Sequence, residues 1–290
     1  MESQVFAKGA KSMSINFNLN NFWRVLVPFG LTQALGLYAA WRFLPDAIAA
    51  KPLDWGNFSW ADLAVPVGFI IIFFVLATKF KRAGSVFYKI FLSLIIFSGS
   101  QAVLGIWFMP VIATVLALAL VVIFWAYQSV LIQNAAMILT IAGIGAAIGI
   151  SLLPITVVYI LVIFSFYDII SVYKTGHMIK MAQAMIESRA IFGFVIPEPG
   201  RTVRAKISGV APGQGFMILG SGDVIFPLLL SVSVISISLA HAVIIAVFGA
   251  LGLFLMHLIF SNQEVRRPMA ALPPIALMAI IGYLLANLIY

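Results

Sequence analysis

The chain contains no cysteine, and only nine of its 290 residues are aspartate or glutamate. The absence of cysteine excludes disulfides, thiolate nucleophiles and thiolate metal sites. Charged residues make up 9% of the chain and hydrophobic residues 63%, a balance that is too apolar for a water-soluble globule of this length. The composition therefore indicates a multi-pass integral protein of the cell membrane, in contact with the lipid bilayer.

The motifs of several enzyme classes are also missing. No His-Glu-x-x-His segment occurs, so the helical zinc site of metalloproteases is excluded. His241 and His257 have no glutamate or cysteine at the spacing of metal ligands. No serine and histidine occur in the motif of a rhomboid-like serine protease. We therefore predict no metal site and no cofactor.

Long apolar stretches predict the fold class. A helix that crosses a hydrocarbon core of about 30 Å needs about 20 apolar residues. The chain offers nine such stretches, and we predict an all-α bundle of nine transmembrane helices. Their expected positions are 23–44, 61–78, 90–109, 110–127, 131–150, 154–173, 216–235, 240–260 and 271–289.

The distribution of basic residues predicts the orientation. A net charge of +8 would suggest a nucleic-acid partner for a soluble protein, whereas cytoplasmic loops of membrane proteins retain lysine and arginine. With a cytoplasmic amino terminus, fifteen basic residues lie inside, and only Arg42 and Lys51 lie outside. We therefore predict a cytoplasmic amino terminus, a carboxyl terminus outside, and no nucleic-acid partner.

One sizeable hydrophilic segment, rich in proline, glycine and basic residues, interrupts the apolar pattern near 175–215. Prolines and glycines prevent a long helix there, although 180–190 can continue the sixth helix or form a surface helix. We divide the chain into an amino-terminal six-helix part (1–186), a flexible cytoplasmic loop (187–215) and a carboxy-terminal three-helix part (216–290).

Asp62 stands at the outer edge of the span 61–78, and Asp168 and Asp223 are the only carboxylates deep inside the predicted spans. Ionisable groups at membrane depth are costly and usually mark a functional site. Asp168 lies about 21 Å from the outer end of the sixth helix, and Asp223 about 12 Å from the cytoplasmic end of the seventh. These antiparallel neighbours therefore present their carboxylates at nearly the same level, which permits the two acids to face each other.

Two carboxylates that lie close together cannot both ionise, so the pair shares a proton near neutrality. Aspartyl proteolysis requires this arrangement, with one member activating water and the other donating to the substrate carbonyl. The acids alone leave two other interpretations open. A proton- or cation-conducting channel or transporter uses buried carboxylates as well, and a structural pair would only hold helices together.

The residues around the acids resemble those of one known family. Tyr167-Asp168, then Gly220-Ser221-Gly222-Asp223, then Ala271-Leu272-Pro273 occur in the order typical of presenilins and signal peptide peptidases, the GxGD intramembrane aspartyl proteases. The resemblance includes the helix layout and the long loop between the sixth and seventh helices. Within the family, the chain looks most like the archaeal presenilin homologues. Type IV prepilin peptidases share only the GxGD aspartate.

The resemblance implies cleavage of peptide bonds within transmembrane helices of substrate proteins, with Asp168 and Asp223 as the catalytic pair. It also implies that Ala271, Leu272 and Pro273 shape the substrate cleft. The chain departs from the family pattern at Ala270, where the first proline is expected. Nothing resembles a subunit-binding domain, so we expect activity without obligatory protein subunits; the oligomeric state stays open.

Three further sequence features bear on helix packing or on the site. Gly220 and Gly222 allow either close helix packing or room for an extended substrate. Tyr167 either forms a hydrogen bond near the acids or fills a polar gap. The Gly145-Ala-Ala-Ile-Gly149 segment favours helix packing.

Overall fold

The computed structural model describes residues 19–49, 81–198, 200–210, 215–263 and 268–289. In this part the chain is mostly helical, with one two-stranded antiparallel sheet. The helices are α1 (Leu19–Ala49), α3 (Lys81–Leu104), α4 (Pro110–Tyr127), α5 (Val130–Gly149), α6 (Pro154–Ile169), α7 (His177–Glu187), α8 (Ser221–Ser233), α9 (Leu239–Ser261) and α10 (Leu272–Ile289). A π-helix, η3 (Ile170–Thr175), continues α6, and a 3-10 turn, η4 (Ile207–Gly209), precedes the second strand.

Most predicted spans correspond to helices. Within the described residues, six helices are long and apolar enough to cross a membrane, and α8 is a shorter apolar helix. The predicted span 61–78 lies outside the described residues. The boundary between α4 and α5 follows from local chemistry, because Gln128 adopts a left-handed conformation with φ of 36°, and Ser129 caps α5 by accepting a hydrogen bond from the backbone of Ile132.

The seventh helix was predicted over 216–235, and this prediction is wrong at its start. Residues Phe216–Gly220 form strand β2, and α8 begins at Ser221. Asp223 therefore lies in the first turn of its helix rather than about two turns inside it. A short apolar run next to glycine does not distinguish a strand from a helix, and the partner strand that decides the matter is distant in the sequence.

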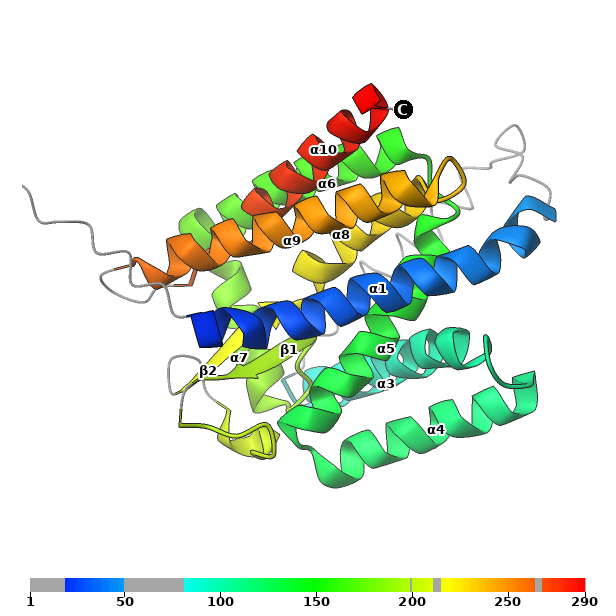
Figure 1. Cartoon of the computed structure of the whole chain (residues 1–290). Coiled ribbons are helices and arrows are strands. Elements are labelled where there is room, and N and C mark those ends of the chain that lie inside the picture. Colours follow the sequence, from blue (N-terminus) through cyan, green and yellow to red (C-terminus); the bar gives the residue numbers. More distant parts are fainter. Residues whose placement is uncertain (1–18, 50–80, 199, 211–214, 264–267, 290) are drawn as a thin grey trace, which may run out of the picture.

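That partner is β1 (Gly193–Pro197), which pairs with β2 in an antiparallel register running from Gly193–Gly220 to Pro197–Phe216. Both strands lie at the end of the bundle where α1 begins and α9 ends (Figure 1). A cluster of buried residues joins this sheet to the start of α5; it consists of Val130, Ile191, Val195, Ile207, Val210 and Phe216. The predicted flexible segment 187–215 thus contributes a strand and buried side chains that its composition did not indicate.

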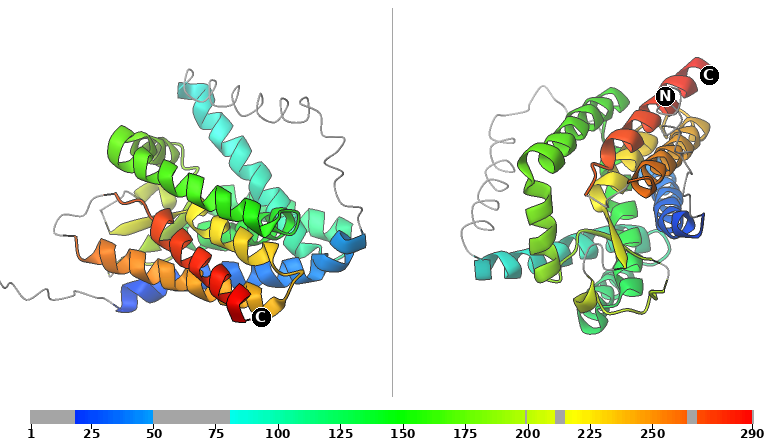
Figure 2. Two further views of the ribbon diagram at one scale, coloured as in Figure 1. Left: turned by 90° about the horizontal axis from the view of Figure 1, so that it is seen from above. Right: turned by 90° about the vertical axis from the view of Figure 1, so that its left-hand side faces the viewer.

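The helices form two groups around α8. α9 and α10 pack along each other, and α6 lies against α10 and α8. On the opposite side, α5 contacts α1, α3 and α8, with α4 outermost (Figures 1 and 2). α8 therefore occupies the middle of the bundle, in contact with α1, α5, α6, α9 and α10.

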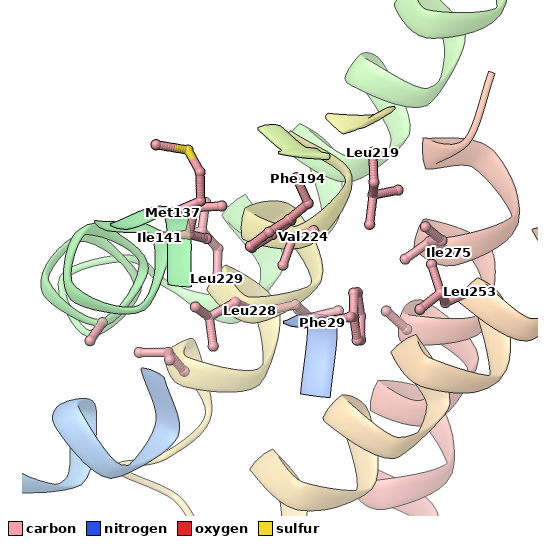
Figure 3. Close-up of a cluster of buried hydrophobic side chains, with 14 of the residues drawn as sticks. Phe29, Met137, Ile141, Phe194, Leu219, Val224, Leu228, Leu229, Leu253 and Ile275 are labelled. Carbon is pink, nitrogen blue, oxygen red and sulfur yellow. The ribbon is translucent and has the colours of Figure 1, made fainter. Parts of the chain in front are cut away.

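The main core reflects this position. Figure 3 shows Val224, Leu228 and Leu229 of α8 near Phe29 of α1 and Met137 of α5. Close approach of α5 to α8 depends on small residues, because a Cβ on Gly149 would lie 2.8 Å from Cβ of Val232. The predicted packing role of the glycine pair in α5 agrees with this contact.

The outer surface is apolar. On α4, large hydrophobic side chains such as Val111, Val115 and Val122 are exposed, whereas few residues of this helix are buried. An apolar outer surface of this extent suits hydrocarbon better than water. The fold is that of a multi-pass membrane protein.

Candidate active site

Asp168 is the second-last residue of α6, two residues before the chain changes to the π-helix η3. Its side chain is buried, with 5% of its surface exposed. The backbone N–H of Leu272 donates a hydrogen bond to Oδ2 of Asp168 at 3.2 Å, and the backbone amide of Ala271 also hydrogen-bonds this carboxylate. π-Helical turns occur often at functional sites, and here the turn immediately follows the acid.

Asp223 is the third residue of α8 and is also buried, with 7% of its surface exposed. Its carboxylate accepts a hydrogen bond from the backbone of Gly220, the residue that precedes the helix. This contact resembles the return half of a capping box, in which an acceptor at the third helical position satisfies the backbone N–H of the cap residue. The helix amino terminus also favours a negative charge at this position.

The two acids belong together spatially. Asp168 lies near enough to Asp223 for the two carboxylates to interact through their charges. α6 and α8 are in contact, and each acid is further held by backbone donors from a different segment. Two buried carboxylates within Coulombic range favour a state in which they share one proton.

The backbone hydrogen bonding of α8 is irregular near Asp223. Pro227 lies inside the helix, and because proline has no N–H, the carbonyl of Asp223 loses its usual partner four residues on. On α1, Nε2 of Gln33 donates to the neighbouring carbonyl of Val224 at 3.0 Å. The backbone around the acid is therefore held partly by a side chain from another helix.

A cavity of about 690 Å³ adjoins Asp223, within the size range of small-molecule and peptide side-chain sites. Gly220, Ser221, Gly222 and Asp223 form one wall, while α7, β2 and Ala271 contribute others. Asp168 is not among the lining residues of this cavity in the described part of the chain. Methionines are prominent in the lining: Met178, Met181, Met185, Met217, Met256 and Met269.

The other predicted site residues divide into two groups. Gly220, Gly222 and Ala271 line the cavity, and Ala270 and Leu272 are buried beside it with 5% and 4% of their surfaces exposed. Pro273 follows Leu272 in the first turn of α10. Tyr167 is different, because the residue is 55% exposed and its ring packs edge-on against Phe164.

The polar residues that hold the sheet are not among those predicted from the sequence. Gln133 and Asn134 of α5 and Arg24 of α1 each form hydrogen bonds with the backbone of β1 or the residues just before it. The signal for them in the sequence is a pair of adjacent amide side chains, Gln133 and Asn134, inside an apolar span. No group of three or more histidine, aspartate or glutamate side chains suitable for a metal ion occurs in the described residues.

Comparison with known proteins agrees with the fold. Two solved structures of a presenilin family intramembrane aspartate protease, in space groups C222 and P2, match with TM-scores of 0.60 and 0.58 at 23% and 22% identity. The matches cover 92% and 91% of this chain and 97% and 96% of those chains, and they establish the fold. Comparison with curated proteins finds no match. The family model described as signal-peptide peptidase, presenilin aspartyl protease matches residues 63–290, and the chain therefore belongs to this family of aspartyl proteases.

Proposed function

We propose that Asp168 and Asp223 are the catalytic pair of this intramembrane aspartyl protease. The observation that carries the proposal is the placement of two buried carboxylates within Coulombic range of each other, one of them in the wall of a cavity. Each acid is also oriented by backbone donors from a separate element, which limits the movement of both carboxylates.

The chemistry follows from the shared proton. The ionised carboxylate accepts a proton from a water molecule, which attacks the carbonyl carbon of the substrate peptide bond, while the protonated carboxylate donates to the carbonyl oxygen. The proton taken from water is then delivered to the leaving amine as the carbon–nitrogen bond breaks, while a hydroxyl of the gem-diol returns its proton to the second carboxylate, which restores the starting pair. The proton belongs to the pair rather than to one assigned acid.

The substrates are transmembrane segments of other proteins, and we propose that the apolar cavity receives their side chains. Methionine side chains are flexible and adapt to differently shaped apolar groups, so the methionine-rich lining suits a range of aliphatic and aromatic residues. Gly220 and Gly222 leave room for the substrate backbone next to Asp223. Ala270, Ala271, Leu272 and Pro273 shape the opposite side, through the segment that hydrogen-bonds Asp168.

We further propose that the chain acts without obligatory protein subunits, in the orientation that its basic residues predict. Both catalytic acids and the cavity are built from this one chain. In this proposal the cytoplasmic segment 187–215 joins the six-helix and three-helix parts, and β1 connects it to the site.

Cleavage of a single-span membrane protein by the purified full-length chain in detergent tests the proposal. Asp168→Asn and Asp223→Asn preserve side-chain size and hydrogen bonding but remove the acid, so each should lower kcat by about 10²- to 10⁴-fold or more. Glu187→Gln, at the exposed end of α7, is the matched control and should retain activity. Each variant should elute and melt like the wild type.

Three outcomes would contradict the proposal. Cleavage that persists in one aspartate variant removes that residue from catalysis, and loss of cleavage in Glu187→Gln points to a general charge effect. If the folded wild-type chain cleaves nothing, the conducting interpretation gains support, and proton or sodium flux into liposomes then distinguishes it from a structural pair.

A further inference from the structure

Strand β1 has two edges, and they are satisfied in different ways. The backbone N–H of Ser221 bonds the carbonyl of Phe192, and the N–H of Glu198 bonds the carbonyl of Gly215. With the observed register, residues 192, 194, 196 and 198 therefore direct their backbone groups toward β2. The backbone groups of residues 191, 193, 195 and 197 face the opposite way, toward α5 and α1.

Asn134 of α5 binds this outer edge as a neighbouring strand would. Its Nδ2 donates to the carbonyl of Val195 at 2.8 Å, and its Oδ1 accepts from the N–H of the same residue at 2.9 Å. One amide side chain thus satisfies both backbone groups of Val195, in the same pattern of one donor and one acceptor that a paired strand offers.

Gln133 and Arg24 satisfy the carbonyls on either side. Nε2 of Gln133 donates to the carbonyl of Ile191 at 2.7 Å and to that of Gly193 at 3.0 Å. Nη1 of Arg24 donates to the carbonyl of Pro197 at 2.8 Å. Proline has no N–H, so this carbonyl is the only polar backbone group that Pro197 presents.

The hydrogen bonds of Gln133 indicate that it holds β1 in place rather than only filling space in the core. The side-chain oxygen Oε1 of Gln133 is buried and has no hydrogen-bond partner in the described residues, which costs free energy. The same amide nonetheless donates to two carbonyls of the chain around β1. A two-stranded sheet is marginal by itself, and here its strands are not joined by a tight turn, so side chains must supply what a third strand would.

We propose that Arg24, Gln133 and Asn134 form an edge clamp, a set of positioning residues that holds β1 and, through it, the segment carrying Asp223. The clamp fixes β1, and β1 pairs with β2 as far as Gly220. The backbone of Gly220 then hydrogen-bonds the carboxylate of Asp223. Helices α1 and α5 thereby set the position of Asp223 relative to Asp168, although neither helix carries a catalytic acid.

The expected effect of the clamp on catalysis rests on the proposed function. Asn134→Leu keeps a similar side-chain volume but leaves both backbone groups of Val195 without their partner. Because misplacing a reacting group by about 1 Å can lower a rate about 100-fold, kcat should fall roughly 10- to 100-fold with little change in KM. The scissile bond, located by mass spectrometry of the products, should become less uniform.

Asn134→Asp provides a rescue that ordinary packing would not produce. An ionised carboxylate accepts from Val195 but cannot donate to its carbonyl, whereas the protonated acid does both. The kcat of this variant relative to wild type, measured at each pH, should therefore rise as the pH falls. Gln101→Leu is the control, because Gln101 links α3 to α4 through Thr114, away from the sheet, and this variant should keep native kcat and products.

Hydrogen exchange separates the clamp from the proposed function. In Asn134→Leu, peptides covering residues 191–197 should lose protection, while peptides of α9 should not. A folded Asn134→Leu protein with native kcat, native products and native protection would overturn the clamp. If the wild-type chain cleaves no substrate, while Asn134→Leu still loses protection over residues 191–197 relative to wild type, the proposed function is contradicted and the clamp is supported.

Discussion

The backbone N–H of Leu272 donates to Oδ2 of Asp168 at 3.2 Å, and this bond joins the start of α10 to the end of α6. Leu272 is followed by Pro273 and Pro274, which have no N–H to offer. First-turn N–H groups have no partner within their own helix, so the amide of Leu272 is available to the carboxylate. The start of α10 thereby orients an acid on another helix that we propose to be catalytic.

Replacing Ala271 by proline tests this orientation. The substitution removes one backbone donor to Asp168 and leaves that of Leu272 in place. Hydrogen bonds to charged groups contribute about 1.5–3 kcal/mol, so kcat for Ala271→Pro should fall about tenfold or more. Ala271→Gly keeps the N–H and should stay near wild-type activity; equal losses in both variants would attribute the effect to the side chain rather than to the donor.

The shared proton that we propose for the two acids predicts the pH dependence of proteolysis. At low pH both carboxyl groups are protonated, and no base remains to activate water. At high pH both are ionised, and no acid remains to donate to the carbonyl oxygen. A plot of kcat/KM against pH should therefore be bell-shaped over roughly pH 4 to 9. A curve that only rises or only falls, with the protein folded at both extremes, would argue against a two-acid mechanism.

The two glycines before Asp223 should differ in their tolerance of a methyl group. A Cβ on Gly220 would lie 3.1 Å from Oδ2 of Asp223, whereas a Cβ on Gly222 would lie 3.5 Å from the ring of Phe226, an ordinary contact. Gly220→Ala should displace the carboxylate and lower kcat about tenfold, while Gly222→Ala should change kcat much less. Parallel kinetics on one substrate decide this, and the reverse order would place the steric limit at Gly222.

The two buried acids could be singled out from the sequence because the bilayer makes isolated carboxylates conspicuous. Asp168 and Asp223 stand out from the long apolar runs around them, and the positions of α4, α5, α9 and α10 follow from length and hydropathy. The start of α8 could not be predicted in the same way. Residues 216–220 are apolar enough for either a helix or a strand, and their pairing with 193–197 is a contact between distant segments.

The edge clamp shows a second limit of prediction from sequence. An amide in an apolar helix costs free energy whatever it binds, so the composition alone indicates that Gln133 and Asn134 need partners but does not identify them. The partners are backbone groups about sixty residues further along the chain. Only the fold brings these amides to the edge of β1.

Close packing between α5 and α8 supports the central position of the helix that carries Asp223. A Cβ on Gly149 would lie 2.8 Å from Cβ of Val232 and 3.3 Å from the carbonyl oxygen of Leu229. Neither neighbour is the flexible end of a side chain, so a larger residue at 149 must separate the helices. Overpacking of this kind typically costs about 1–3 kcal/mol, and Gly149→Val should lower the melting temperature in detergent.

Gly30→Ala provides the matched control for that loss of stability. Gly30 lies on α1, and an added Cβ there meets no atom within 4 Å, so Gly30→Ala should melt at or slightly above the wild-type temperature because alanine favours helix. Gly149→Val should also lose activity in proportion to the unfolded fraction and recover it at lower temperature. A variant at 149 that melts like wild type would mean that α5 and α8 can separate without cost, and the glycine would then have no packing role.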